Sequence, residues 1–458
     1  MGTHPVRSPH RGAGPQSFLG CCRHFLTPQV WKQVHQPCWH YHAIRWQAQP
    51  LLLVLLVMTW CAGDSQAERF ETARAFYVAS YPRQRRPGKA PAGFDKALAR
   101  LPAAALRQMA AAVRRRLQQV FAGRLAVEGF VPLGCDGTRL NCPRTPQLER
   151  RLRAGPKPHD PPTVFVSAVV HLSLGLLWSW RLGGPRASEQ GHLARLLPTL
   201  PRQALVVADA GYVGYALLRK LAAARCSFLI RLCGRAPLYT PQRVAFSRQR
   251  EGLAYYWPKE AQKEGQPPVV VRVLRLRGRK AVGRKRAEVW LMTNVFSAAQ
   301  LPRAAASKFY RWRWRSEGLF RTYKRTLGKV KLLGRTVAQV HREAEGSLLA
   351  TQLLLAQGAW ALQRAGAGRG GRPSARQVLR EVRVEIRDVT GRYLGPRQRQ
   401  TYWQRLREVR GEGRRRRCRQ RVRRRWPSRV DHKPPGPPRI RAMGTALKEL
   451  LAKTLATQ

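Results

Sequence analysis

The sequence predicts a mixed α/β fold whose sheet is interrupted by a β-rich insertion. Between residues 129 and 294, short apolar runs typical of buried strands recur along the chain. Stretches with apolar residues at helical spacing separate several of these runs, which favours a mixed sheet flanked by helices. Helical spacing also precedes this region, and a strongly basic stretch follows it. We therefore expect a helical N-terminal region and a basic C-terminal tail around the sheet.

The N-terminal region divides into two parts. Residues 1–48 are rich in His, Trp, Pro and Arg and show no periodicity, so we expect them to be disordered or to precede the true start of the protein. Residues 49–127 contain two helical stretches, 50–81 and 94–127, separated by a basic linker. We expect this second part to be a helical DNA-binding region.

The sheet begins in residues 128–234. A first apolar run, 129–135, leads directly to Asp136, and a later one, 204–208, leads directly to Asp209. Between them, two runs joined by a tight turn predict a hairpin, and another strand follows a helix after Asp209. The runs that predict these three further strands are 163–172, 175–182 and 227–232.

Residues 235–287 form the expected β-rich insertion, with a strand at 269–276 and a basic turn at 278–285. The main sheet resumes in residues 288–365, with a strand at 288–294 and long helices at 302–326 and 340–363. Residues 366–458 are expected to be a Gly-rich linker and a basic tail. The run Arg414–Arg425 in that tail is either a phosphate-binding segment or a solvated basic stretch.

Charge limits the class of partner. The chain has 86 Lys and Arg residues against 24 Asp and Glu residues, a formal net charge of +62. Such an excess favours a polyanionic partner, of which nucleic acid is the usual one. The apolar run 50–60 is far shorter than the roughly 20 residues of a membrane-spanning helix, so we expect no membrane partner and a cytoplasmic, nucleoid-associated protein. Composition alone does not separate an enzyme from a non-catalytic architectural protein.

Cysteine usage favours reduced thiols. The nine cysteines include no CxxC pair, and a chain of this size does not need disulfides for stability. Cys22, His24, Cys38 and His40 have a spacing that matches no standard zinc site.

Acidic residues are scarce, so their placement is informative. Asp136 and Asp209 each stand at the end of an apolar run, where two carboxylates on neighbouring strands suggest a shared cation. A third acid, Glu317, lies in the 302–326 helix. At about 100° per residue, Tyr310, Arg313, Glu317 and Lys324 fall within roughly 60° of one helix face. The opposite face, with Ser316, Leu319 and Tyr323 among its residues, is expected to pack on the sheet.

These residues resemble the type-four insertion-sequence transposases, a branch of the DDE transposase family. The spacing of Tyr310, Arg313, Glu317 and Lys324 matches the Tyr-Arg-Glu-Lys signature of that branch. The sequences GCDGT around Asp136 and VVADAGY around Asp209 resemble its first and second acid motifs. The resemblance runs from about residue 129 to residue 333.

The resemblance implies a ribonuclease-H-like catalytic domain that cleaves DNA at transposon ends and joins them to target DNA. Asp136, Asp209 and Glu317 would be both the catalytic acids and the ligands of two Mg²⁺ ions, for which Mn²⁺ would substitute. Tyr310, Arg313 and Lys324 would contact the transposon-end DNA. A homodimer is expected in the synaptic complex, because two ends must be synapsed. Members of this branch commonly pass through a DNA hairpin.

Two alternatives remain open at the level of sequence. A different nuclease on the same fold explains the three acids but not the Tyr-Arg-Glu-Lys pattern, and a non-catalytic DNA-binding or architectural protein explains only the charge. Within the insertion, Tyr255, Tyr256 and Trp257 either stack against a flipped base or fill a small hydrophobic core.

Overall fold

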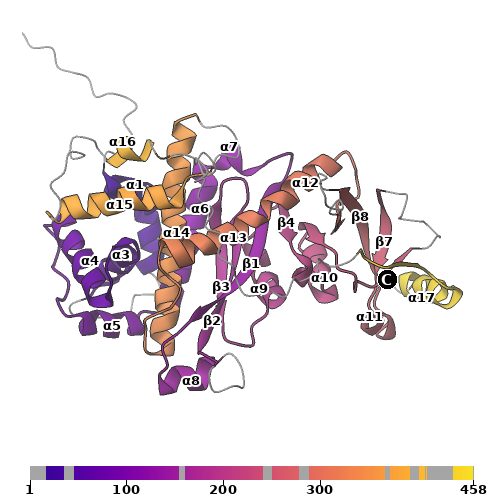
Figure 1. Cartoon of the computed structure of the whole chain (residues 1–458), viewed down its shortest axis with the longest axis horizontal. Coiled ribbons are helices and arrows are strands. Elements are labelled where there is room, and N and C mark those ends of the chain that lie inside the picture. Colours follow the sequence, from indigo (N-terminus) through magenta and orange to yellow (C-terminus); the bar gives the residue numbers. More distant parts are fainter. Residues whose placement is uncertain are drawn as a thin grey trace, which may run out of the picture. The chain divides into compact units, whose positions relative to one another are not determined.

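The computed structural model describes residues 17–35, 46–153, 160–240, 250–277, 288–366, 372–391, 402–407, 409 and 437–456. The chain divides into two compact units. The helical unit comprises Met1–Ala122, Asn141–Arg151 and Thr322–Arg414. The sheet unit comprises Gly123–Leu140, Leu152–Arg321 and Arg415–Gln458. The helices and strands of both are labelled in Figure 1.

The helical unit is built around α3 (Ala48–Trp60) and α14 (Val337–Arg364). Helix α3 is apolar on every side and is buried along its whole length, which explains why the run 50–60 occurs in a chain without an expected membrane segment. Helix α14 begins with a capping box, in which Thr336 and Gln339 satisfy each other's backbone groups. Around these two pack α4 (Gln66–Ser80), α5 (Pro91–Arg100), α6 (Ala103–Val120), α15 (Ala375–Val389) and α16 (Tyr402–Arg407). Most of α8 (Pro146–Leu152) belongs to the same unit.

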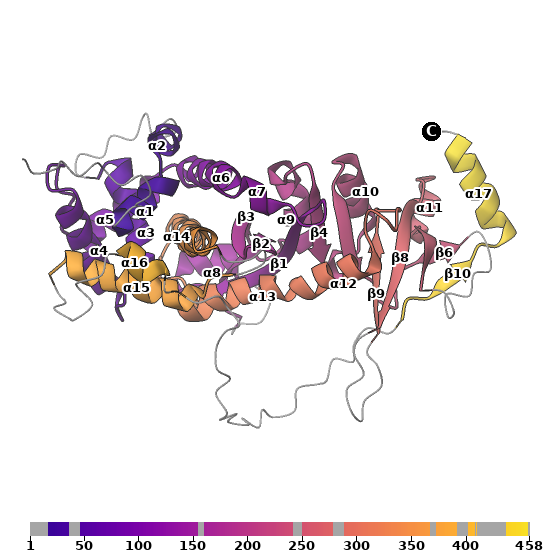
Figure 2. The same cartoon turned by 90° about the horizontal axis from the view of Figure 1, so that it is seen from above.

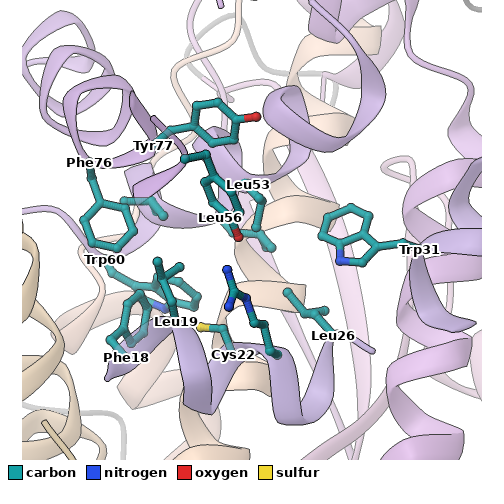
Figure 3. A pocket seen from close by; sticks show the side chains of 13 residues that line it. Phe18, Leu19, Cys22, Leu26, Trp31, Leu53, Leu56, Trp60, Phe76 and Tyr77 are labelled. Carbon is teal, nitrogen blue, oxygen red and sulfur yellow. The ribbon is translucent and has the colours of Figure 1, made fainter. Parts of the chain in front are cut away.

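Two helices occupy part of the stretch 1–48, for which disorder was expected. Helices α1 (Phe18–Phe25) and α2 (Pro28–His35) are short, but α1 has a Ser17 N-cap and buries Phe18 and Phe25 in the helical unit. The pocket in Figure 3 lies beside α1 and is lined mainly by apolar and aromatic side chains of the same unit. Tertiary packing of aromatic side chains therefore orders a segment that has no long periodic pattern.

Three other expectations from the sequence concern residues outside those that the structure describes. They are Cys38 and His40, most of the linker at 366–373, and the run Arg414–Arg425. None of the helices described is both long and apolar enough to cross a membrane.

The sheet unit contains one sheet, in which ten strands are described, in the order β10-β6-β7-β8-β9-β5-β4-β1-β2-β3. Strands β2 (Thr163–His171) and β3 (Leu176–Gly183) form the predicted antiparallel hairpin beside β1 (Val131–Asn141). Strand β4 (Ala204–Ala208) is parallel to both β1 and β5 (Ser227–Arg231). A hairpin followed by two parallel strands on the other side of β1 is the ribonuclease-H-like arrangement, and the predicted fold class is confirmed.

The insertion extends the main sheet. Strands β6 (Leu238–Thr240), β7 (Glu251–Tyr256) and β8 (Val269–Arg277) add to the edge of β9 (Glu288–Thr293), which itself pairs with β5. At the far edge, β10 (Ile440–Ala442) pairs with β6, and α17 (Thr445–Ala456) packs beside α11 (Lys259–Lys263). These last elements lie in the part expected to be a basic tail, and they are ordered because leucines of α17 pack on the core of the insertion.

Helices cover both faces of the sheet unit, as Figure 2 shows for α9 and α10 on one side and α12 and α13 on the other. Helices α9 (Glu189–Leu196) and α10 (Tyr215–Ala223) pack on one apolar face. Helix α12 (Arg303–Trp312) packs on the other face, through Ala306 and Phe309. The single helix expected over 302–326 is interrupted: α13 (Trp314–Arg321) begins after a turn at Arg313, and a π-helical turn, η4 (Thr322–Thr326), follows it.

Candidate active site

The register of two neighbouring parallel strands brings the first two acids to the same level, with Asp136 in β1 and Asp209 directly after β4. Strand β1 pairs with β4 in a register that places Leu133 opposite Val206 and Gly134 opposite Val207. Continued by two residues, the same register brings Asp136 level with Asp209. Neighbouring strands lie about 4.8 Å apart, so two residues at the same level are adjacent. The apolar run predicted that Asp136 stands at the end of its strand. Strand β1 instead continues to Asn141, so Asp136 lies within it.

The third acid reaches this place because α13 approaches β1 very closely. A Cβ on Gly134 would collide with Oγ of Ser316 and would lie 2.6 Å from Cδ2 of Leu172. Only a glycine therefore leaves room for the helix at this point of the strand. Ser316, which is fully buried, sits over Gly134, and Glu317 follows it in the helix. Gly134, two residues before Asp136, thus lies directly beneath Ser316, the residue before Glu317.

Local hydrogen bonds orient the carboxylates. The Gly137 backbone N–H donates to Oδ1 of Asp136 at 2.8 Å, and the Gly211 N–H donates to Oδ1 of Asp209 at 2.9 Å. Asp209 is also the N-cap residue of a short turn, η3 (Ala210–Tyr212). Glu317 has a looser partner, since Nη2 of Arg313 lies 3.4 Å from its Oε1 and its side chain is 38% exposed.

The acids lie close enough to influence one another. The pKa of Asp136 is raised to about 6, mainly by burial and in addition by the negative charges of Asp209 and Glu317. The Gly137 N–H and the Arg313 guanidinium partly offset these effects. Mutual repulsion of carboxylates at one place is the electrostatic condition that a bound cation relieves.

The donor set suits a hard divalent cation. Carboxylate oxygens are the ligands that Mg²⁺ and Mn²⁺ prefer. Among the described residues, no Lys or Arg forms an ion pair with Asp136 or Asp209, although the chain has 86 basic residues. Nor do three His, Cys, Asp or Glu side chains in that part of the chain converge tightly enough to hold an ion as they stand. A shared ion therefore requires a side chain to turn, and the half-exposed Glu317 has only the Arg313 contact to release.

Two further residues of the signature are buried beside the acids. Tyr310 is 8% exposed and Arg313 is 6% exposed, so they do not form the open face expected from helical spacing. The Arg313 guanidinium lies over the rings of Trp314 and Tyr310, at 4.7 Å and 5.8 Å from their centroids. Within the described residues, Oη of Tyr310 and Nε of Arg313 have no hydrogen-bond partner. Buried polar groups without partners leave hydrogen bonds for an oxygen-rich ligand to complete.

Lys324 is placed differently. It lies in the π-helical turn η4, which belongs to the helical unit, and burial lowers its pKa. Tyr310, Arg313 and Glu317 keep the expected shared face, since the Arg313 guanidinium contacts both the Tyr310 ring and the Glu317 carboxylate. Lys324 lies beyond the regular helix, because the π turn changes the residue spacing per turn on which the expectation for it depended.

A fourth acid, Glu189, was not predicted from the sequence. It occupies the first turn of α9 after the N-cap Ser188, and its carboxylate lies against Gly137 and near Gly211. Burial raises its pKa, and so do the charges of Asp209 and Asp136. A glutamate after a serine at a helix start is a common feature of helices, so its only signal in the sequence was the general scarcity of acids.

Comparison with known proteins identifies the domain. Residues 135–353 match the family described as the transposase DDE domain. This match covers just under half of the chain, whose function is that of a DNA transposase with DNA as its partner. DDE domains generally use divalent metal ions. The match begins just before Asp136 and includes Asp209 and Glu317.

No curated protein matches the sequence. Among solved structures, the chain resembles that described as "Cryo-EM structure of piggyBac transposase synaptic complex with hairpin DNA (SNHP)", with 10% sequence identity and a TM-score of 0.43. The similarity covers 84% of this chain and 83% of that one.

The aromatic residues of the insertion are mostly internal. Trp257 is fully buried, and its Nε1 donates to the Gln266 carbonyl at 2.7 Å. Tyr256 is 6% exposed, and Ala261 and Met443 pack with Trp257. Of the two alternatives for this segment, the structure favours a hydrophobic core, which a buried Trp with a satisfied N–H stabilises.

Proposed function

We propose that this transposase belongs to the type-four insertion-sequence branch and cleaves transposon ends with two divalent metal ions, Mg²⁺ or Mn²⁺. Asp136, Asp209 and Glu317 are the catalytic acids and the residues that hold the ions. The observation that carries the proposal is the register of β1 and β4, whose continuation brings Asp136 level with Asp209 directly after β4, together with the close approach to Gly134 of α13, which carries Glu317.

When bound, such a pair of ions stabilises the attacking and the leaving oxygen on either side of the phosphorus. The protein's contribution is orientation. The Gly137 and Gly211 amides each hold one carboxylate oxygen of Asp136 and Asp209, so these side chains do not need to be ordered when DNA arrives. Glu317 is the acid with the weakest local partner, and we assign to it the movement that completes the site.

Tyr310, Arg313 and Lys324 bind the transposon-end DNA near the scissile phosphate. The free hydrogen-bonding capacity of Oη of Tyr310 and Nε of Arg313 supports this for the first two. When the Glu317 carboxylate turns toward a cation, it leaves the Arg313 guanidinium. The guanidinium then binds a DNA phosphate in place of the carboxylate. For Lys324, the spacing of the signature is the support. We further infer a homodimer, since two ends must be held for joining to target DNA.

A nicking assay tests this function. The purified chain is mixed with DNA carrying the terminal repeats of its own element, with Mg²⁺, with Mn²⁺ or with EDTA. We expect metal-dependent cleavage at the repeat end, abolished by Asp136→Asn, Asp209→Asn or Glu317→Gln while DNA binding is retained. Binding without metal-dependent cleavage by the parent protein would instead support a non-catalytic architectural protein.

A salt titration tests the DNA contacts. Each phosphate contact adds about 0.9 to the slope of log binding constant against log salt concentration for duplex DNA. Lys324→Ala should weaken end binding and reduce that slope by about one contact. An unchanged slope would contradict a phosphate contact by Lys324.

A further inference from the structure

A fourth carboxylate stands at the place where the two aspartates meet, in a part of the fold that the Tyr-Arg-Glu-Lys signature does not include. Glu189 comes from α9, which packs on the opposite face of the sheet from α13. Its side chain reaches the sheet at Gly137, the residue that follows Asp136 in β1. A Cβ on Gly137 would collide with Oε1 of Glu189 and would lie 3.0 Å from its Cγ.

The second aspartate motif lies near the same carboxylate. A Cβ on Gly211, two residues after Asp209, would lie 3.1 Å from Oδ1 of Asp209 and 3.7 Å from Oε2 of Glu189, and the second distance is an ordinary contact. The two oxygens of Glu189 thus face the backbone after each aspartate. Glycine in GCDGT leaves the space that this carboxylate occupies, which gives a physical reason for that glycine.

The start of α9 is fixed firmly to the segment after Asp209. Nε2 of Gln190 donates to the Gly211 carbonyl at 2.8 Å and to the Val213 carbonyl at 3.4 Å. Ser188 caps the helix by accepting from the Gly191 N–H. Glu189 lies between these two anchored residues, so its backbone has little freedom and its carboxylate is held toward the aspartates.

The Gly137 backbone N–H offsets part of the charge of Glu189, and no basic side chain neutralises it within the described residues. Among the described residues, no Lys or Arg forms an ion pair with it. A half-buried carboxylate beside two others is unfavourable, because it is desolvated and the like charges repel, unless a cation joins them.

We propose that Glu189 is a fourth acidic residue of the metal site, acting from the face opposite Glu317, where it holds or orients the ion shared with Asp136 and Asp209. This inference rests on the proposed function, because it presumes that the aspartates bind divalent ions. The placement gives each face of the sheet one glutamate directed at the pair of aspartates. Because Asp136, Asp209 and Glu189 do not converge tightly enough to hold an ion as they stand, the side chains of both glutamates turn when the ion binds, while the backbone of Glu189 stays anchored.

The test uses the full chain and Mn²⁺ as the probe, without DNA and with it. Glu189→Gln keeps the shape of the side chain and leaves the Gln190 contacts in place. Free Mn²⁺ is measured by electron paramagnetic resonance to give the affinity of the DNA-free protein. We expect the Gln variant to bind Mn²⁺ about tenfold more weakly, as is typical when a residue that orients metal ligands is lost. The Mn²⁺ concentration that gives half-maximal cleavage should rise by the same factor. High Mn²⁺ should restore cleavage.

The matched control is Glu260→Gln, because Glu260 is also in the first turn of a helix of the sheet unit but is exposed. It should bind Mn²⁺ as the parent does. Parental Mn²⁺ affinity and parental Mn²⁺ dependence in Glu189→Gln would overturn the proposal. So would a fall in melting temperature with no rescue by Mn²⁺, since that is the result of a structural role. Glu189→Asp, which keeps the charge, should lie between the parent and the Gln variant.

Asp136→Asn, measured in parallel, separates the two levels of inference. Loss of Mn²⁺ binding in Asp136→Asn with parental behaviour of Glu189→Gln would overturn only the role of Glu189. Retention of Mn²⁺ binding and cleavage in Asp136→Asn would overturn the proposed metal site itself, and the role of Glu189 with it.

Discussion

Removing the charge of Asp136 should stabilise the metal-free protein while abolishing cleavage. The carboxylate is largely buried, and its pKa is raised from 3.8 to about 6 by burial and by the neighbouring acids. The folded state therefore binds a proton more tightly than the unfolded state does. The stabilisation that this proton gives the fold is fully present below about pH 4 and is lost as the pH rises through about 6.

The size of the effect follows from the same values. Each pKa unit corresponds to about 1.4 kcal/mol, so the ionised Asp136 costs the fold up to about 3 kcal/mol at pH 8. Asparagine does not ionise, and its Oδ1 still accepts from the Gly137 N–H. For a unit of this size, about 3 kcal/mol corresponds to a rise in melting temperature of roughly 6–12 °C.

The assay is thermal unfolding of the parent and of Asp136→Asn in EDTA, from pH 4 to pH 8. The variant should be more stable at pH 8, and the difference should vanish near pH 4. Added Mg²⁺ should stabilise the parent and not the variant. Asp64→Asn is the control, since Asp64 is exposed and far along the chain from the acids, and it should melt as the parent does. A variant that is equally or less stable than the parent at pH 8 would refute the idea that Asp136 belongs to a cluster of repelling carboxylates.

Three other substitutions test how the site and the insertion are built. Gly134→Ala should displace α13 from β1 and reduce cleavage about 100-fold, because small displacements of catalytic groups are costly. DNA binding in a gel-shift assay should be unchanged, and parental cleavage would contradict the close approach of α13 to β1. Arg313→Lys loses the planar guanidinium and should weaken binding to the repeat end about tenfold by fluorescence anisotropy, so unchanged affinity would exclude a phosphate contact there. Trp257→Ala should destabilise the insertion by about 3–5 kcal/mol and expose it to limited proteolysis, whereas a protected insertion would show that Trp257 is not its core.

Much of the sheet could be predicted from the sequence because buried strands are continuous apolar runs. Strands β2, β4 and β5 lie where those runs lie. The end of β1 was not predictable in this way, because residues after Asp136 are less apolar and yet the backbone continues in the strand to Asn141. Apolarity reports burial of side chains, and strand pairing is a property of the backbone.

The helix that carries Glu317 shows the opposite limit. Residues 302–326 have helical spacing throughout, and no Gly or Pro marks the turn at Arg313 or the π turn at Thr322–Thr326. The spacing predicted one face for Tyr310, Arg313 and Glu317, and these residues do contact one another, but it did not predict that the first two are buried. Irregular turns of this kind are imposed by packing on the sheet, which local sequence does not record.

Glu189 illustrates what only tertiary structure supplies. Its local sequence describes an ordinary capped helix start, and its importance arises from the meeting of α9, β1 and η3 around two glycines. The tail gives a second example, since α17 adds its leucines to the core of an insertion that lies far from it in the sequence.

The most direct measurement of the site is the anomalous scattering of Mn²⁺ in crystals of the protein grown with its terminal-repeat DNA. We expect two Mn²⁺ peaks, with Asp136 bound to both ions and Asp209 and Glu317 each bound to one. Peaks that lie away from these three carboxylates, or the lack of any peak beside a bound repeat end, would contradict the proposed metal-dependent mechanism.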